Sequence, residues 1–194
     1  MRDGTSSVLG SAVTACLWIA ASAIGASAAV VTLEASEAAM IENPEEPTER
    51  RVLMRFDIPD HLSDGIVEIA ALEFQTALSV PDSSEGVTLD CFQVTEPWDA
   101  ESVDWDEGWD NAGGDFDTAS HAMCGAAVGD SSHVQFDVTG MVASWATMGA
   151  DNRGILVARA PGEEAVLQVV RGAVGQVVSS PRLTIWYTPR RSEQ

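Results

Sequence analysis

The chain contains no lysine, and arginine supplies all ten of its basic residues. It carries 30 acidic residues, so its formal net charge is −20. A nucleic-acid-binding protein neutralises many phosphates with lysine and arginine, so this composition argues against nucleic acid as a partner. It argues equally against an anionic membrane surface. Cations, and neutral or basic surfaces, are the partners that the charge favours.

Sequence signatures of enzymes are also missing. There is no Gly-rich phosphate loop, no dinucleotide-binding fingerprint and no CxxC or cysteine–histidine cluster for zinc. Residues 129–133, Gly-Asp-Ser-Ser-His, contain residue types found in some esterases. A catalytic triad, however, draws its groups from separate elements that converge in space. We therefore expect a protein that is not an enzyme.

The length of 194 residues suits one domain, and a hydrophobic content of 45% suffices for a core. Residues 12–25 form an uncharged apolar run, shorter than a membrane span of about 20 residues. Ala-Ser-Ala at 26–28 then fits the signal-peptidase pattern. We expect a secretory signal at 1–28, a folded domain at 29–188 and a tail at 189–194. The protein would then be extracellular or periplasmic, with no membrane contact beyond the cleaved signal.

Two cysteines remain after removal of this signal, Cys91 and Cys124. A pair of cysteines in an exported domain predicts one disulfide bond, because the compartment is oxidising. The alternative is a pair of buried free thiols.

Most of the remaining chain shows the period-2 alternation of half-buried strands. Turn signals rich in proline, glycine and serine separate these segments. The pattern predicts an all-β fold, an antiparallel β-sandwich. The expected strands lie at 51–57, 71–78, 87–91, 133–138, 154–160, 165–170 and 182–187.

One segment breaks this alternation. Apolar residues at helical spacing predict a single short helix near 139–148. Asp137 or Thr139 can cap its start, and Gly149 can end it. We expect Trp145 to plug one end of the sandwich.

Residues 95–120 combine tryptophans with many acidic residues and predict a long loop, with a brief strand at 102–105. Sugar binding needs aromatic faces beside planar polar side chains, and Trp105, Trp109, Asp106 and Asp110 have these properties. They are therefore the candidate ligand-binding residues. The alternative is that Trp98 and Trp105 are core residues that fix the loop, which leaves Trp109 as the exposed candidate.

The same loop is a candidate calcium site. Hard cations prefer clustered carboxylate and carbonyl oxygens, and Asp110, Asp115 and Asp117 lie around a Gly-Gly turn. A bound calcium would be structural, since it would neutralise a loop that otherwise repels itself. The alternative is a solvated acidic loop.

Four local matches to one family run in order along the chain. The first is an opening pair of segments, the second begins and ends with a tryptophan, the third spans the predicted helix and the fourth is a closing strand. The series resembles the DNRLRE domain family of secreted carbohydrate-binding-like modules. The matching segments are 53–59 with 70–74, 98–105, 136–154 (through Val142, Trp145, Asn152 and Gly154) and 181–187.

The resemblance implies a jelly-roll-like β-sandwich that is exported. Some members of the family are associated with polysaccharide binding, including acidic polysaccharides such as alginate. Binding a polyanion would need a local arginine patch, for which Arg50, Arg51 and Arg55 are candidates, or a bridging cation. Where the family pattern expects a proline after Trp105, this chain has 106–109, Asp-Glu-Gly-Trp.

We therefore predict a secreted, non-catalytic β-sandwich module that binds polysaccharide or another cell-surface polymer, with calcium as a candidate structural ion. The first alternative is a structural or adhesive envelope protein without a small ligand. The second is a hydrolase or lyase that acts on polysaccharide.

Overall fold

The computed structural model of the chain describes residues 28–79, 87–126, 129–160, 166–169 and 180–190. The predicted signal at 1–28, except for Ala28, and residues 191–194 of the tail predicted at 189–194 lie outside these residues. Pro189 of the predicted tail is the last residue of β10. No helix in the described part of the chain is long and apolar enough to cross a membrane.

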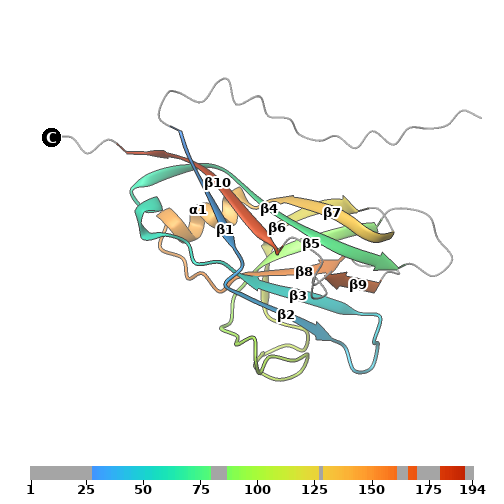
Figure 1. The fold of residues 1–194 in the computed structure, drawn as a ribbon. Coiled ribbons are helices and arrows are strands. Elements are labelled where there is room, and N and C mark those ends of the chain that lie inside the picture. The colour runs from blue at the N-terminus through green and yellow to red at the C-terminus, as the bar shows by residue number, and fades with distance from the viewer. Residues whose placement is uncertain (1–27, 80–86, 127–128, 161–165, 170–179, 191–194) are drawn as a thin grey trace, which may run out of the picture.

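Two antiparallel five-stranded sheets form the molecule (Figure 1). Sheet A has the order β1-β10-β4-β7, and β9 pairs with the far end of β4. Sheet B has the order β2-β3-β8-β5-β6. The strands of sheet A are β1 (Ala29–Glu34), β4 (Gly65–Ser79), β7 (Gly129–Asp137), β9 (Val166–Val169) and β10 (Arg182–Pro189). Those of sheet B are β2 (Glu37–Glu42), β3 (Arg50–Arg55), β5 (Val87–Val94), β6 (Phe116–Ala126) and β8 (Ile155–Arg159).

The chain crosses between the sheets in a jelly-roll path. It starts in sheet A with β1, passes to β2 and β3 in sheet B, returns for β4, and crosses again for β5 and β6. β7 then returns to the edge of sheet A, β8 takes an interior place in sheet B, and β9 and β10 both pair with β4 in sheet A. This connectivity joins strands that are distant in sequence, as expected for a double Greek key. The predicted all-β sandwich is confirmed.

Alternating side chains of both sheets make the main core. On β3 the inward residues are Val52 and Met54, and on β4 they are Leu72 and Phe74. The rings of Phe74 and Phe136 stack with centroids 6.2 Å apart. These side chains are almost fully buried, so each contributes about 1.5–3 kcal/mol of burial free energy.

The predicted short helix is α1 (Thr139–Thr147), which closes one end of the sandwich against β4 and a 3-10 turn, η1 (Asp60–Leu62). The Asp137 carboxylate accepts the Thr139 N–H at 3.0 Å, just before the helix. Gly149 follows the helix with φ 73°, the left-handed conformation that favours glycine at a helix end. Trp145 is buried in the main core, as predicted.

Differences from the sequence prediction concentrate around β6. This strand was expected to belong to a loop, and the strand expected at 102–105 is not formed. β6 is an edge strand whose side chains are mostly exposed or half-buried, so its sequence has no strong apolar alternation. β1 and β2, which have similarly weak patterns, were not predicted either.

The disulfide prediction is wrong, because Cys91 and Cys124 are free thiols. Cys91 on β5 lies opposite Ala122, and Cys124 on β6 lies opposite Leu89. The two cysteines are therefore diagonal neighbours, whose Cβ atoms are separated by about 7 Å in such pairs, against about 4 Å in a disulfide. Burial raises the pKa of the Cys91 thiol well above its ordinary value and also raises that of Cys124.

Candidate functional site

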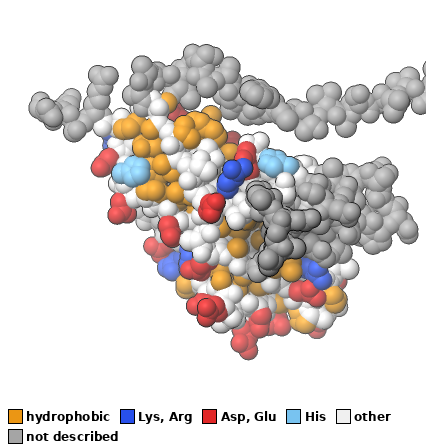
Figure 2. Space-filling model, viewed as in Figure 1, with side chains coloured by type: hydrophobic (Ala, Val, Ile, Leu, Met, Phe, Trp, Pro, Cys, Tyr) orange, Lys and Arg blue, Asp and Glu red, His pale blue; other side chains and the backbone are white. Residues whose placement is uncertain are grey.

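The segment between β5 and β6, the 95–115 loop, folds across the outer face of sheet B. Outward side chains of β2, β3 and β8 meet two tryptophans of this loop there and form a second buried group, the outer cluster. Figure 2 shows acidic side chains gathered at the lower end of the molecule, where this loop lies in Figure 1. The outer cluster consists of Ala39, Ile41, Leu53, Val94, Trp98, Trp105 and Leu156.

Trp98 and Trp105 anchor the loop, and each is only 7% exposed. The Trp98 indole N–H donates to the Arg153 carbonyl at 2.7 Å, which ties the loop to the residues before β8. The Arg55 guanidinium lies 5.3 Å from the Trp98 ring centroid. Trp105 was a predicted ligand-binding residue, but its place in the outer cluster matches the alternative that it fixes the loop.

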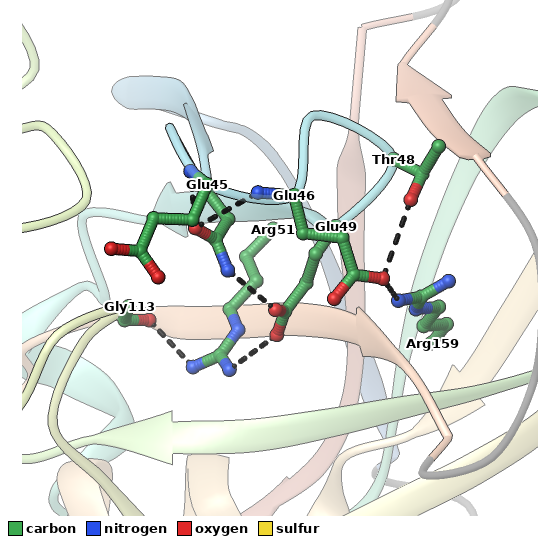
Figure 3. Close-up of polar contacts among 8 residues, drawn as sticks. Glu45, Glu46, Thr48, Glu49, Arg51, Gly113 and Arg159 are labelled. Carbon is green, nitrogen blue, oxygen red and sulfur yellow. Dashed lines mark hydrogen bonds and ion pairs between the residues drawn. The ribbon is translucent and has the colours of Figure 1, made fainter.

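Arg51 of β3 links three segments (Figure 3). Its Nη1 donates to the Gly113 carbonyl of the loop at 2.7 Å, and its Nη2 donates to Glu49 at 2.9 Å. The same guanidinium stacks over Trp105, 4.6 Å from the ring centroid. Gly113 has φ 86°, and a Cβ on it would lie 2.7 Å from Arg51 Nη1. Only glycine therefore lets the loop approach this arginine.

Electrostatic contacts stabilise the Glu49 carboxylate in its ionised form. Burial raises the pKa of Glu49, but hydrogen bonds from Asn43 and Arg51, with the charges of Arg51 and Arg159, outweigh burial and hold it below its ordinary value. The Asn43 side chain donates to Glu49 at 2.9 Å. The β2–β3 turn and the 95–115 loop therefore share one network of polar contacts.

The candidate arginines for a polyanion are all engaged by glutamates. Arg50 pairs with Glu42, Arg51 with Glu49 and Arg55 with Glu37 across β2 and β3 or within their turn. Each charge is therefore balanced locally. These contacts do not form a free basic patch on β3.

Asp115 and Asp117, two of the three predicted calcium ligands, accept hydrogen bonds from neighbouring residues. Asp115 is buried, and its carboxylate accepts the Asp110 N–H at 2.6 Å and the Asn111 side-chain amide at 2.5 Å. Burial raises the pKa of Asp115, but these donors and the Asn111 N–H outweigh it and lower that pKa. Asp117 instead accepts the Ala119 N–H. No group of three metal-ligating side chains occurs among the described residues, so the structure does not bring the three aspartates together as a metal site.

The remaining predicted sugar-binding residues do not converge either. Trp109 is half-buried against the outer cluster, and its indole N–H donates to the Asp104 carbonyl at 2.9 Å. Asp106 and Asp110 are exposed on the loop. The Asp104 carboxylate accepts the N–H groups of Asp106 and Glu107, so it stabilises a turn.

A cavity does form along the loop, lined by other residues. It is open to solvent and has a volume of about 430 Å³, within the range of small-ligand sites. The loop backbone around it is held by Asp99, whose carbonyl accepts the Val103 N–H at 2.9 Å and whose carboxylate accepts the Glu101 N–H at 2.8 Å. Pro97, Trp98 and Val103 provide apolar lining, and Asp99, Ser102 and Glu107 provide polar lining.

Sequence reasoning pointed to this loop but to other residues of it. The cavity residues lie at 97–103 and 107–108, and Trp98 among them was expected only as a core residue. Pro97 directly before Trp98, followed by an Asx-type turn at Asp99, is the local signal that could have identified this wall.

Comparison with family models and with curated proteins finds no match to this chain. The resemblance to the DNRLRE domain family therefore remains a hypothesis.

Proposed function

We propose that this protein is an exported, non-catalytic β-sandwich module that binds a polysaccharide at the cavity of the 95–115 loop. The cavity carries the proposal, because it combines an apolar wall with hydrogen-bonding groups. The C–H faces of sugars pack on aromatic and apolar side chains, and their hydroxyl groups donate hydrogen bonds to carboxylates. The resemblance to the DNRLRE domain family points to the same class of ligand and to export through residues 1–28.

The cavity is fixed before any ligand arrives, which favours binding. Trp98 is held by its bond to the Arg153 carbonyl, and Asp99 holds the following turn through its carbonyl and its carboxylate. A rigid wall loses little conformational entropy when a ligand packs against it. The proposed site therefore lies on a loop that is anchored against the sheet, rather than on a free loop tip.

Affinity electrophoresis of the protein through gels that contain single polysaccharides tests the proposal. We expect one polysaccharide to retard the protein, and Ser102→Trp, which fills the cavity with a large side chain, to abolish the retardation. Thr118→Trp adds the same side chain to exposed β6 outside the cavity and should change nothing. Equal loss in both variants, or no retardation by any polysaccharide, would contradict the proposal.

An alternative is a structural or adhesive protein, and one observation favours it. Apolar side chains form a row across the outer face of sheet A, where Val30, Trp186 and Ile69 lie opposite one another on β1, β10 and β4. Val30 is 54% exposed and Ile66, on the same face, is 50% exposed. This alternative predicts concentration-dependent self-association in sedimentation velocity, reduced by Trp186→Ser and unaffected by Ser102→Trp.

A further inference from the structure

We infer that the cavity selects a polysaccharide with free amino groups, a glucosamine-type polymer whose protonated amine lies between Asp99 and Glu107. The inference rests on the proposed function and names the class of sugar within it. Neutral and acidic polysaccharides are then poor ligands.

The first observation is the charge that lines the cavity. One carboxylate oxygen of Asp99 accepts the Glu101 N–H, whereas its other oxygen and the whole Glu107 carboxylate receive no hydrogen bond from the described residues. Figure 2 shows further acidic side chains gathered around this end of the molecule. Two carboxylates with free acceptor oxygens favour a ligand that brings positive charge and N–H donors.

The second observation is that arginine does not neutralise these carboxylates. Among the described arginines, the two nearest the Trp98 wall are already paired, Arg55 with Glu37 and Arg153 with Asp151. Neither lines the cavity. The chain has no lysine, so no ammonium group of its own competes for the site. An acidic polymer would meet only like charge here.

The third observation is the apolar wall beside the carboxylates. Pro97, Val103 and the small exposed part of Trp98, which is 7% exposed, offer an apolar surface for the C–H face of a pyranose ring. A free metal ion or a small amine would leave this wall in water. An amino sugar uses both the wall and the carboxylates, which is why the geometry points to it.

Isothermal titration with three hexasaccharides of equal length tests the inference. The probes are the hexamers of glucosamine, N-acetylglucosamine and glucose in β-1,4 linkage. We expect the glucosamine hexamer to bind and the other two to bind more weakly by about tenfold or more, because both lack the positive charge. Binding should weaken as salt rises and as the pH rises enough to deprotonate the amine.

A matched pair of double variants separates the cavity from the general acidity of the loop. Asp99→Asn with Glu107→Gln removes two charges from the cavity and keeps the Asp99 carbonyl-type oxygen that accepts the Glu101 N–H. Glu101→Gln with Asp106→Asn removes two charges from the same loop outside the cavity. We expect the first variant to lose about tenfold in affinity per carboxylate and the second to lose little.

Three results would overturn the inference. Equal weakening in both double variants, or equal binding of hexalysine, would show diffuse attraction between a polycation and an acidic protein. Equal binding of the glucose or N-acetylglucosamine hexamer, abolished by Ser102→Trp, would overturn the amine selectivity and leave the proposed function in place. Binding of none of the hexamers, together with no retardation by any polysaccharide, would overturn both.

Discussion

Side chains alternate between the inner and outer faces of both sheets, but the outer face of sheet B is covered by the 95–115 loop, whereas the outer face of sheet A is open. On sheet B, Trp98 and Trp105 of the 95–115 loop pack against the sheet and bury Leu53 and Leu156. On sheet A, the corresponding side chains of β1 and β10 include Val30, which stays 54% exposed, and the half-buried Trp186. Figure 2 shows hydrophobic side chains gathered over the region where β1 and β10 lie in Figure 1.

This difference shows where the chain uses its aromatic residues. A tryptophan on a covered face stabilises a loop, whereas a tryptophan on an open face contributes little to folding and remains available for contact. The polar contacts of the covered face also differ from those of the open face. The covered face has Arg51 at its centre with two partners, and the open face has a Thr32–Thr184 contact at 3.4 Å. The comparison predicts unequal effects for matched substitutions on the two faces.

The largest effect is expected from Trp105→Ala. It removes a buried side chain from the outer cluster and exposes the Arg51 guanidinium, so the free energy of unfolding should fall by about 3–5 kcal/mol. Urea unfolding followed by far-ultraviolet circular dichroism measures this. A loss below about 1 kcal/mol would mean that the loop does not cover sheet B in solution.

Arg51→Met should cost less, about 2 kcal/mol, because methionine keeps the packing but leaves the Gly113 carbonyl and Glu49 without their donor. Hydrogen exchange should show the opening first at the amides of the 95–115 loop. The matched change Arg182→Met on the exposed end of β10 should stay within about 0.5 kcal/mol. An equal loss of unfolding free energy in Arg51→Met and Arg182→Met would contradict the difference between the covered and the open face.

Acidification should loosen the covered face before the open one. The pKa values of Glu49 and Asp115 lie below their ordinary values in the folded protein, so these carboxylates stabilise it at neutral pH. That contribution is lost as the pH falls from the ordinary values, 4.5 and 3.8, through the lower folded values.

Glu49→Gln with Asp115→Asn should therefore flatten the dependence of unfolding free energy on pH in this acid range. Glu34→Gln with Glu68→Gln removes the same charge from sheet A and serves as the control. An unchanged slope in the first double variant would show that these two carboxylates do not stabilise the loop.

The smallest effect is expected from Trp186→Ala. The ring packs beside Val30 and Ile69 on an open face, so its removal should cost about 1 kcal/mol or less. Thermal unfolding of this variant beside Trp105→Ala gives the sharpest single comparison. A cost equal to that of Trp105→Ala would show that an additional element buries Trp186 in solution.

The strands of the main core could be predicted because their buried apolar side chains recur at every second position in the sequence. Val52 and Met54 on β3, and Leu72 and Phe74 on β4, occupy every second position and face the main core. β6 shows no such apolar alternation, because an edge strand buries few of its side chains. The helix was found through its spacing and through Asp137 and Gly149 at its ends.

The candidate site was only partly predictable, since loop geometry depends on contacts between distant residues. The acidic pattern suggested that Asp110 and Asp115 would share a ligand. In the structure, Asp115 accepts the Asp110 N–H, so one aspartate organises the backbone of the other. The wall at Trp98 depends on Arg153 and Arg55, which lie 55 and 43 positions away and gave no local signal.

The position of β10 has a consequence for how this domain is made. β10 is the last strand of the chain, yet it lies in the interior of sheet A between β1 and β4. During synthesis from the amino terminus, β1 and β4 emerge first and have no direct pairing with each other. Sheet A can therefore close only after translation of β10, and the folding rate depends on this contact between the most distant strands.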